Sequence, residues 1–260
     1  MSVKSIIYIP FTGLGLYNGF RGQNWFENRA EIFKKYTLQS LANQTDKDFL
    51  IWISFRPEEK DNEVTKKIEG YVKATDISYI FTFNGLMFWD DKDLERNKTW
   101  KERLTEALKN FSIKEDYVYL TLLGSDDMFS EDIVEYVKKQ EYKNGKALYM
   151  KNGYVYNSKT KELADWNNPF SVANYTLMYE RDEFLDAERH IMKQSNLTTH
   201  EMIPQIYLAE EIEGRRYCCV IHGLNISTIW DHPYKRKQYF YEKDKEKILE
   251  KFGIVTKKKQ

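Results

Sequence analysis

The stretch YVYLTLLGSDDMFSEDI, residues 117–133, decides the fold class of this chain. Its first seven residues are almost continuously apolar, which is typical of a strand buried on both faces. The strand runs directly into a turn that carries Ser125, Asp126 and Asp127. Strands of this kind occur in parallel sheets that helices cover on both sides, so the stretch predicts an α/β protein.

Further strands and helices precede this stretch and alternate along the chain. Apolar runs and apolar residues at helical spacing predict strands at 4–10, 49–55 and 78–83 and helices at 25–43, 62–74 and 92–111. This alternation indicates a mainly parallel sheet flanked by helices. Ligands bind such sheets beyond the carboxyl ends of the strands. We therefore expect the site in the loops that follow Pro10, Phe55, Phe83 and Leu123.

The second half of the chain has shorter elements. Strands are predicted at 146–157, 171–180 and 217–222, and helices near 183–193, 201–213 and 242–252. We find no linker and no repeat, so we predict a single domain over residues 1–260. Its second part, 131–260, would be an α+β elaboration packed on the first part, 1–130.

Composition limits the classes of protein to which the chain can belong. Its 40 basic and 40 acidic residues give no net field that would attract a nucleic acid or an anionic membrane. Its 15% aromatic content is too high for a disordered chain. The apolar runs are shorter than a membrane span or a signal-peptide core requires. We therefore predict a cytoplasmic protein without a transmembrane segment or a nucleic-acid partner, with Cys218 and Cys219 as buried thiols.

Asp126 and Asp127 are adjacent carboxylates at the end of a buried strand, and their like charges repel each other. A divalent metal would offset this repulsion and could also hold a diphosphate. Alternatively, Asp127 and Ser130 cap a helix that starts at Glu131 and has an acidic first turn. The position of the pair at the expected ligand edge favours the metal site.

Three blocks of sequence resemble the GT-A glycosyltransferases, and within them a rhamnosyltransferase-like group. The blocks are RAEIFKKYTLQSLANQTDKDFLIWIS (29–54), LLGSDDMF (122–129) and HGLNIST (222–228). The first block resembles the family's arginine followed by a helix that ends in a Gln-Thr turn. The second resembles the acidic motif after the fourth strand, and the third resembles a late His-x-x-Asn segment. The ordered set spans roughly 200 residues and is moderately specific.

The resemblance implies a GT-A, Rossmann-like fold and sugar transfer with inversion. The donor would be a UDP-, dTDP- or GDP-linked sugar, such as rhamnose or another hexose, and the acceptor a hydroxyl of a glycan or glycoconjugate. Mn²⁺ or Mg²⁺ would assist the transfer, held by Asp126, Asp127 and His222. Gly124 replaces the first aspartate of the family motif, which removes one carboxylate. Residues 1–130 would bind the nucleotide sugar, and residues 131–260 the acceptor.

Candidates for the donor site lie near the ends of the first and fourth strands. A leaving diphosphate gains negative charge as the sugar bond breaks, so cationic side chains must face it. Arg21, Arg29 and Arg56 are possible cations near the first two strand ends. The resemblance implies nucleotide-sugar contacts after the first strand and at the acidic motif, namely Pro10, Phe11, Thr12, Ser125 and Asp126.

An inverting transfer also needs a carboxylate that takes the proton from the acceptor hydroxyl. Glu201 precedes a predicted helix at a position similar to that of the family's acidic residue, and Asp165 is the second candidate. Alternatively, Glu201 only interacts favourably with the dipole of its helix.

Two other functions stay open. The glycines of GLGLYNG (13–19) follow the first strand, as in folds that bind the pyrophosphate of NAD, but the third glycine stands at 19 instead of 18. This spacing disfavours an NAD-dependent oxidoreductase. The missing first aspartate leaves room for a non-catalytic relative that binds a nucleotide or a glycan.

Overall fold

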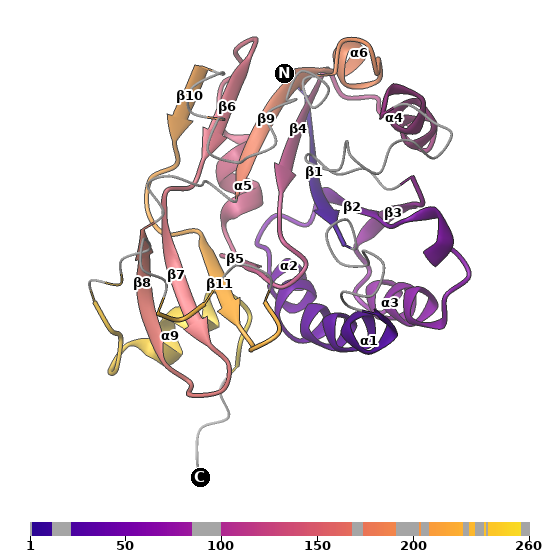
Figure 1. The fold of residues 1–260 in the computed structure, drawn as a ribbon. Helices are drawn as coiled ribbons and strands as arrows, with labels where there is room; N and C mark the ends of the chain where they lie inside the picture. Colours follow the sequence, from indigo (N-terminus) through magenta and orange to yellow (C-terminus); the bar gives the residue numbers. More distant parts are fainter. Residues whose placement is uncertain are drawn as a thin grey trace.

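The chain folds into two sheets with helices packed around them (Figure 1). A computed structural model describes residues 2–11, 22–84, 100–167, 174–190, 203, 208–225, 229–231, 237 and 239–255, to which every structural statement below refers. Strands from both 1–130 and 131–260 take part in the larger sheet, which has seven strands in the order β10-β6-β9-β4-β1-β2-β3. In the described part of the chain, no helix is long and apolar enough to cross a membrane.

The larger sheet is built around β1 (Val3–Pro10). On one side β1 pairs in parallel with β2 (Phe49–Ser54), and β3 (Ser78–Thr82) extends the sheet beyond β2. On the other side β1 pairs in parallel with β4 (Tyr117–Leu122). The inner residues of β1 are buried without interruption because both faces of the sheet are covered. These four parallel strands confirm the predicted α/β fold with a mainly parallel sheet.

Strands of the second half complete the larger sheet. β9 (Tyr175–Glu180) lies antiparallel between β4 and β6 (Lys146–Tyr149), and β10 (Leu208–Glu211) pairs in parallel with β6. The prediction of a helix over 201–213 is therefore wrong at 208–211. β10 is an edge strand with largely exposed side chains, so its sequence has no apolar alternation that would indicate a strand.

The single strand predicted at 146–157 is also wrong. It consists of β6 and β7 (Asn152–Asn157), which belong to different sheets. The chain passes from one sheet to the other at Met150, whose N–H donates to the Asn174 carbonyl at 3.1 Å. Because both strands are rich in apolar and aromatic residues, the pattern alone does not reveal this crossing.

The helix predicted at 25–43 is confirmed as one continuous helical segment. It consists of α1 (Gly22–Ile32), a π-helical stretch η1 (Phe33–Leu38) and α2 (Gln39–Ala42). Its buried side carries apolar residues of the core and also Arg29. A buried arginine is unusual unless it is paired, so Arg29 requires a partner.

Helices cover the two faces of the larger sheet. Side chains alternate along β1, so that Ile7 contributes to the core on one face and Tyr8 to the core on the other. The first core includes residues of the long helical segment, α3 (Glu63–Lys73) and α5 (Ile133–Lys138). The second core includes residues of α4 (Trp100–Leu108) and α6 (Arg181–Phe184).

The smaller sheet has the strand order β5-β11-β7-β8, with β5 (Met128–Phe129), β11 (Tyr217–Ile221) and β8 (Leu163–Asn167) beside β7. Figure 1 shows α9 (Lys245–Glu250) next to this sheet, and Leu249 of α9 contacts its core. Cys218 and Cys219 of β11 are buried free thiols, as predicted. β5 directly follows the acidic turn and β11 directly precedes His222, so their pairing brings these two segments together.

His190 gives the stability of this fold a specific pH dependence. It is fully buried against the rings of Tyr179 and Phe184, with centroid distances of 4.6 and 5.1 Å. Burial lowers the pKa of His190 to about 3, because the charged imidazole would lose its solvation. The unfolded chain protonates this residue near pH 6.5, so its contribution to stability is present above that pH and is lost as the pH falls towards 3.

We therefore expect the wild-type chain to lose stability faster on acidification than His190→Phe does. The excess loss should be about 1.4 kcal/mol per pH unit between about pH 6 and pH 4. Urea unfolding at stepped pH measures both curves. Parallel curves for the two proteins would contradict a neutral buried His190.

Candidate functional site

The acidic loop, residues 124–127, lies at the carboxyl edge of the larger sheet, where the sequence predicts the site. Backbone hydrogen bonds continue the parallel pairing past the strand ends. The Leu123 N–H donates to the Tyr8 carbonyl at 3.0 Å, and the Phe11 N–H donates to the Ser54 carbonyl at 3.0 Å. The acidic loop therefore leaves the sheet directly beside the end of β1.

Segments that are far apart in the sequence meet at Asp126. Its Oδ2 atom forms an ion pair with Nη1 of Arg29 from α1. The same Oδ2 lies 3.1 Å from Nε2 of His222 and accepts a hydrogen bond from Nδ2 of Asn225 at 3.2 Å. We call Arg29, Asp126, His222 and Asn225 the Asp126 cluster. Three of its members are candidates of the sequence analysis: Asp126 and His222 as metal ligands, and Arg29 as a cation for the diphosphate.

Charge and burial set the electrostatics of the Asp126 cluster. Burial opposes ionisation of Asp126, but the charge of Arg29 and the hydrogen bond with His222 outweigh it, so the pKa of this carboxyl is lowered. The side chain of Arg29 is 3% exposed and that of Asp126 is 18% exposed. A carboxylate with a lowered pKa is a weak base, so Asp126 is suited to hold a cation rather than to take a proton.

Asn225 is the member of the cluster that the sequence analysis missed. Its Oδ1 accepts the N–H of His222 at 2.9 Å, while its Nδ2 donates to the carbonyl of Val220 at 2.8 Å and to Asp126. These bonds fold the turn after β11 back onto the acidic loop. The only signal for this role is the spacing of His222 and Asn225 in the third block of the resemblance.

The start of helix α5 does not fit the alternative in which Asp127 and Ser130 cap it. Its Oδ1 accepts the N–H of Val220 in β11 at 3.3 Å, and Ser130 donates to Oδ1 of Asp132 at 2.5 Å. Helix α5 begins at Ile133, two residues later than predicted, and the side chain of its preceding residue, Asp132, does not cap it. Asp127 therefore links the acidic loop to the smaller sheet.

Gly124 makes room for the two carboxylates of the acidic loop. A Cβ atom at this position would lie 3.1 Å from Oδ2 of Asp127 and 3.4 Å from Oδ1 of Asp126. An aspartate at position 124 would bring a third carboxylate into the same space. Glycine at this position, where the resemblance leads us to expect an aspartate, leaves the space beside the two carboxylates free.

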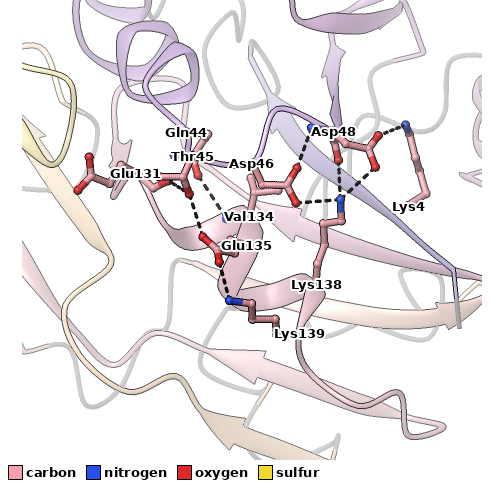
Figure 2. A network of polar contacts seen from close by, with 10 residues as sticks. All are labelled: Lys4, Gln44, Thr45, Asp46, Asp48, Glu131, Val134, Glu135, Lys138 and Lys139. Atoms are coloured by element: carbon pink, nitrogen blue, oxygen red, sulfur yellow. Dashed lines mark hydrogen bonds and ion pairs between the residues drawn. The ribbon is translucent and has the colours of Figure 1, made fainter.

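The Gln-Thr turn of the first block supports the segment that follows the acidic loop. Nε2 of Gln44 donates to the carbonyl of Ser130 at 2.8 Å, and its Oε1 accepts the N–H of Val134 at 3.3 Å. The N–H of Thr45 donates to the carbonyl of Glu131 at 2.7 Å. Figure 2 shows the contacts of Gln44 with Val134 and of Thr45 with Glu131, and the ion pairs of Lys138 with Asp46 and Asp48 that join the same two segments. Gln44 and Thr45 therefore position the chain after the loop and do not belong to the Asp126 cluster.

The residues of the site, as arranged, do not fit a metal ion. Within the described residues there is no group of three or more His, Cys, Asp or Glu side chains that could hold one. Oδ2 of Asp126 is already in contact with three nitrogen atoms. The assignment of Asp126, Asp127 and His222 as ligands of Mn²⁺ or Mg²⁺ stays a prediction.

The candidates at the end of β1 have limited access to a ligand. Phe11 is 2% exposed and packs against Phe26, Phe33 and Phe55, so its side chain belongs to the core. Pro10 is half-buried at the end of β1. Thr12 and Arg21 lie outside the described residues. At this strand end, a nucleotide could contact the backbone but not the ring of Phe11.

Arg56 lies at the end of β2, about 10 Å from β4 because two strand spacings separate them. Nη1 of Arg56 is 3.8 Å from Oε1 of Glu58 in the short helical turn η2 (Pro57–Glu59). Ser125 is buried in the acidic loop. Ser125 therefore neighbours Asp126 in the same loop, whereas Arg56 lies farther along the edge of the sheet.

Asp165 is held in the smaller sheet, away from the Asp126 cluster. Its Oδ1 accepts the N–H of Tyr239 at 2.8 Å, and its Oδ2 lies 3.4 Å from Nη2 of Arg215. It belongs to β8, which is two strands from β11 and thus about 10 Å away. Glu201, the other candidate base, lies outside the described residues.

Comparisons with known proteins do not identify the function of this chain. No protein-family model and no curated protein matches the chain. A 4-diphosphocytidyl-2C-methyl-D-erythritol synthase from Anaerococcus prevotii aligns with 11% identity and a TM-score of 0.39, over 85% of this chain and 86% of that chain. An inositol-1-phosphate CTP transferase from T. maritima aligns with 9% identity and a TM-score of 0.37, over 83% of this chain and 87% of that chain. Alignments at this level carry no argument about function, and membership of the rhamnosyltransferase-like group stays a prediction.

Proposed function

We propose that the chain is a glycosyltransferase whose Asp126 cluster binds the diphosphate of a nucleotide sugar. The observation that supports this proposal is the meeting of a buried arginine with Asp126 and His222 at the carboxyl edge of a mainly parallel sheet. Ligands of such sheets bind at this edge. The sequence resemblance points to the same chemistry, with a UDP-, dTDP- or GDP-linked sugar as donor and a glycan hydroxyl as acceptor.

In the proposed reaction, Arg29 stabilises the leaving group. The bond between the anomeric carbon and the diphosphate breaks as the acceptor hydroxyl attacks, and negative charge collects on the diphosphate oxygens. A cation fixed in a partly buried site stabilises this charge more than a solvated one would. Asp126 and the turn of His222 and Asn225 hold the guanidinium in position, so that it needs no rearrangement during the reaction.

The proton of the acceptor hydroxyl must pass to a base. We assign this role to Glu201, because the carboxylate of Asp165 is already engaged by Arg215 and the backbone of Tyr239. Attack on the face opposite the leaving diphosphate would invert the configuration at the anomeric carbon.

A panel of nucleotide sugars tests the proposal. A preferred donor at about 100 times its Kd should stabilise the fold by about 2.7 kcal/mol, which raises the Tm by roughly 5–10 °C. Differential scanning fluorimetry with UDP-, GDP- and dTDP-linked sugars measures the shift, and uridine without a diphosphate is the control. If only NAD⁺ shifted the Tm, the oxidoreductase would be favoured. Binding without transfer to any glycan acceptor would indicate the non-catalytic relative.

A further inference from the structure

The Oδ2 atom of Asp126 has no lone pair left for a metal ion. Oδ2 is contacted by Arg29, His222 and Asn225, whereas a carboxylate oxygen offers about two lone pairs. A metal ion could bind Oδ2 only if at least one of these nitrogen atoms moved away. Loss of the Arg29 contact would leave a nearly fully buried guanidinium without its counter-charge, which is strongly unfavourable.

Two cations of the chain lie at the acidic loop or at the turn that follows β11. Arg29 offsets Asp126 directly. Lys159, in the turn between β7 and β8, extends to the turn after β11, where its Nζ lies 2.5 Å from the position that a Cβ of Gly223 would take. Gly223 has a φ of +87°, so glycine both permits this turn and leaves the space that Lys159 occupies. Arg29 therefore offsets the charge of Asp126 from within the chain.

Arg29 also has donors to spare. A guanidinium has five N–H groups, and among the described residues Nη1 of Arg29 pairs with Asp126. Its Nε is buried and has no hydrogen-bond partner within the described part of the chain. The guanidinium lies 5.0 Å from the ring centroid of Trp25, which restricts its orientation. A fixed arginine with unused donors suits an oxyanion such as a phosphate group.

We propose that Arg29 takes the electrostatic role of the metal that the GT-A resemblance implies, so that the chain binds a nucleoside diphosphate without a divalent cation. This inference rests on the proposed function, because it concerns the same site and the same class of ligand. It differs from the prediction made from the sequence, in which Asp126 acts as a metal ligand.

Isothermal titration calorimetry tests the inference with UDP, GDP and dTDP as probes. We expect at least one of them to bind with a Kd that agrees within about threefold in EDTA and in Mn²⁺. Arg29→Gln should weaken this binding by about 10- to 100-fold, and Arg29→Lys by less because it keeps the charge. Arg216→Gln is the matched control, since Arg216 pairs with an aspartate, Asp132, outside the Asp126 cluster. Its affinity for the probe should equal that of the wild type.

A second measurement does not depend on whether the Arg29 variants fold. Electron paramagnetic resonance of Mn²⁺ mixed with the wild-type chain should show only free Mn²⁺. One Mn²⁺ bound per chain and lost in Asp126→Asn, or nucleotide binding only in the presence of Mn²⁺, would overturn the inference and leave the proposed function intact. No binding of any probe in either buffer would instead overturn the proposed function.

Discussion

Replacing Asp126 with alanine is expected to lower the free energy of unfolding by about 3–5 kcal/mol, because it leaves a buried arginine without its carboxylate. Arg29 is 3% exposed, and among the described residues Asp126 is the carboxylate with which it pairs. The corresponding fall in Tm is roughly 6–20 °C for a chain of this size. Urea unfolding and scanning calorimetry measure the two quantities.

A matched pair outside the site provides the control for this substitution. Arg216 and Asp132 form an ion pair at 3.1 Å, but their side chains are 19% and 45% exposed. Asp132→Ala should therefore cost only about 0–1 kcal/mol. The double variant Arg29→Met and Asp126→Ala should recover much of the loss, because it removes the unpaired charge as well. If Asp126→Ala lowered the free energy of unfolding no more than Asp132→Ala does, the ion pair of Asp126 with Arg29 would be exposed to solvent and not buried.

Replacing Trp52 with alanine is expected to cost about 3–5 kcal/mol, because it empties a large part of the core beneath the carboxyl edge of the sheet. Trp52 is fully buried, and its ring lies 4.5 Å from that of Tyr8 and 5.0 Å from that of Phe111. Its Nε1 donates to Oγ1 of Thr82 at 2.9 Å. Chemical denaturation measures the loss.

Two further variants divide this effect into its parts. Trp52→Phe keeps most of the ring but leaves Thr82 without its donor, so we expect a cost of about 1–3 kcal/mol. Leu208→Ala changes an exposed residue of the edge strand β10 and should alter stability by no more than about 0.5 kcal/mol. A Trp52→Ala protein as stable as Leu208→Ala would show that the packing around Trp52 contributes little.

The Asp126 cluster could be predicted only in part from the sequence. The carboxyl edge of the sheet could be found, because it follows from the order of strands and helices. Arg29, Asp126 and His222 could each be named as candidates from their residue types and blocks. The resemblance placed Asp126 and His222 at one site, but as ligands of a metal. Their direct contact with each other and with Arg29 could not be predicted, since His222 is 96 residues from Asp126 and the contact depends on the pairing of β5 with β11.

Local pattern by itself determined the parallel strands, the long helix and the position of the acidic loop, because continuous apolar runs and helical spacing reflect burial that is already encoded over a few residues. Tertiary structure alone decided the division of residues 146–157 between two sheets, the strand at 208–211 and the role of Asn225. It also decided that the guanidinium of Arg29 pairs with Asp126. These features depend on contacts between residues that are far apart in the sequence. A local sequence pattern does not show which distant side chain will contact a given charged residue.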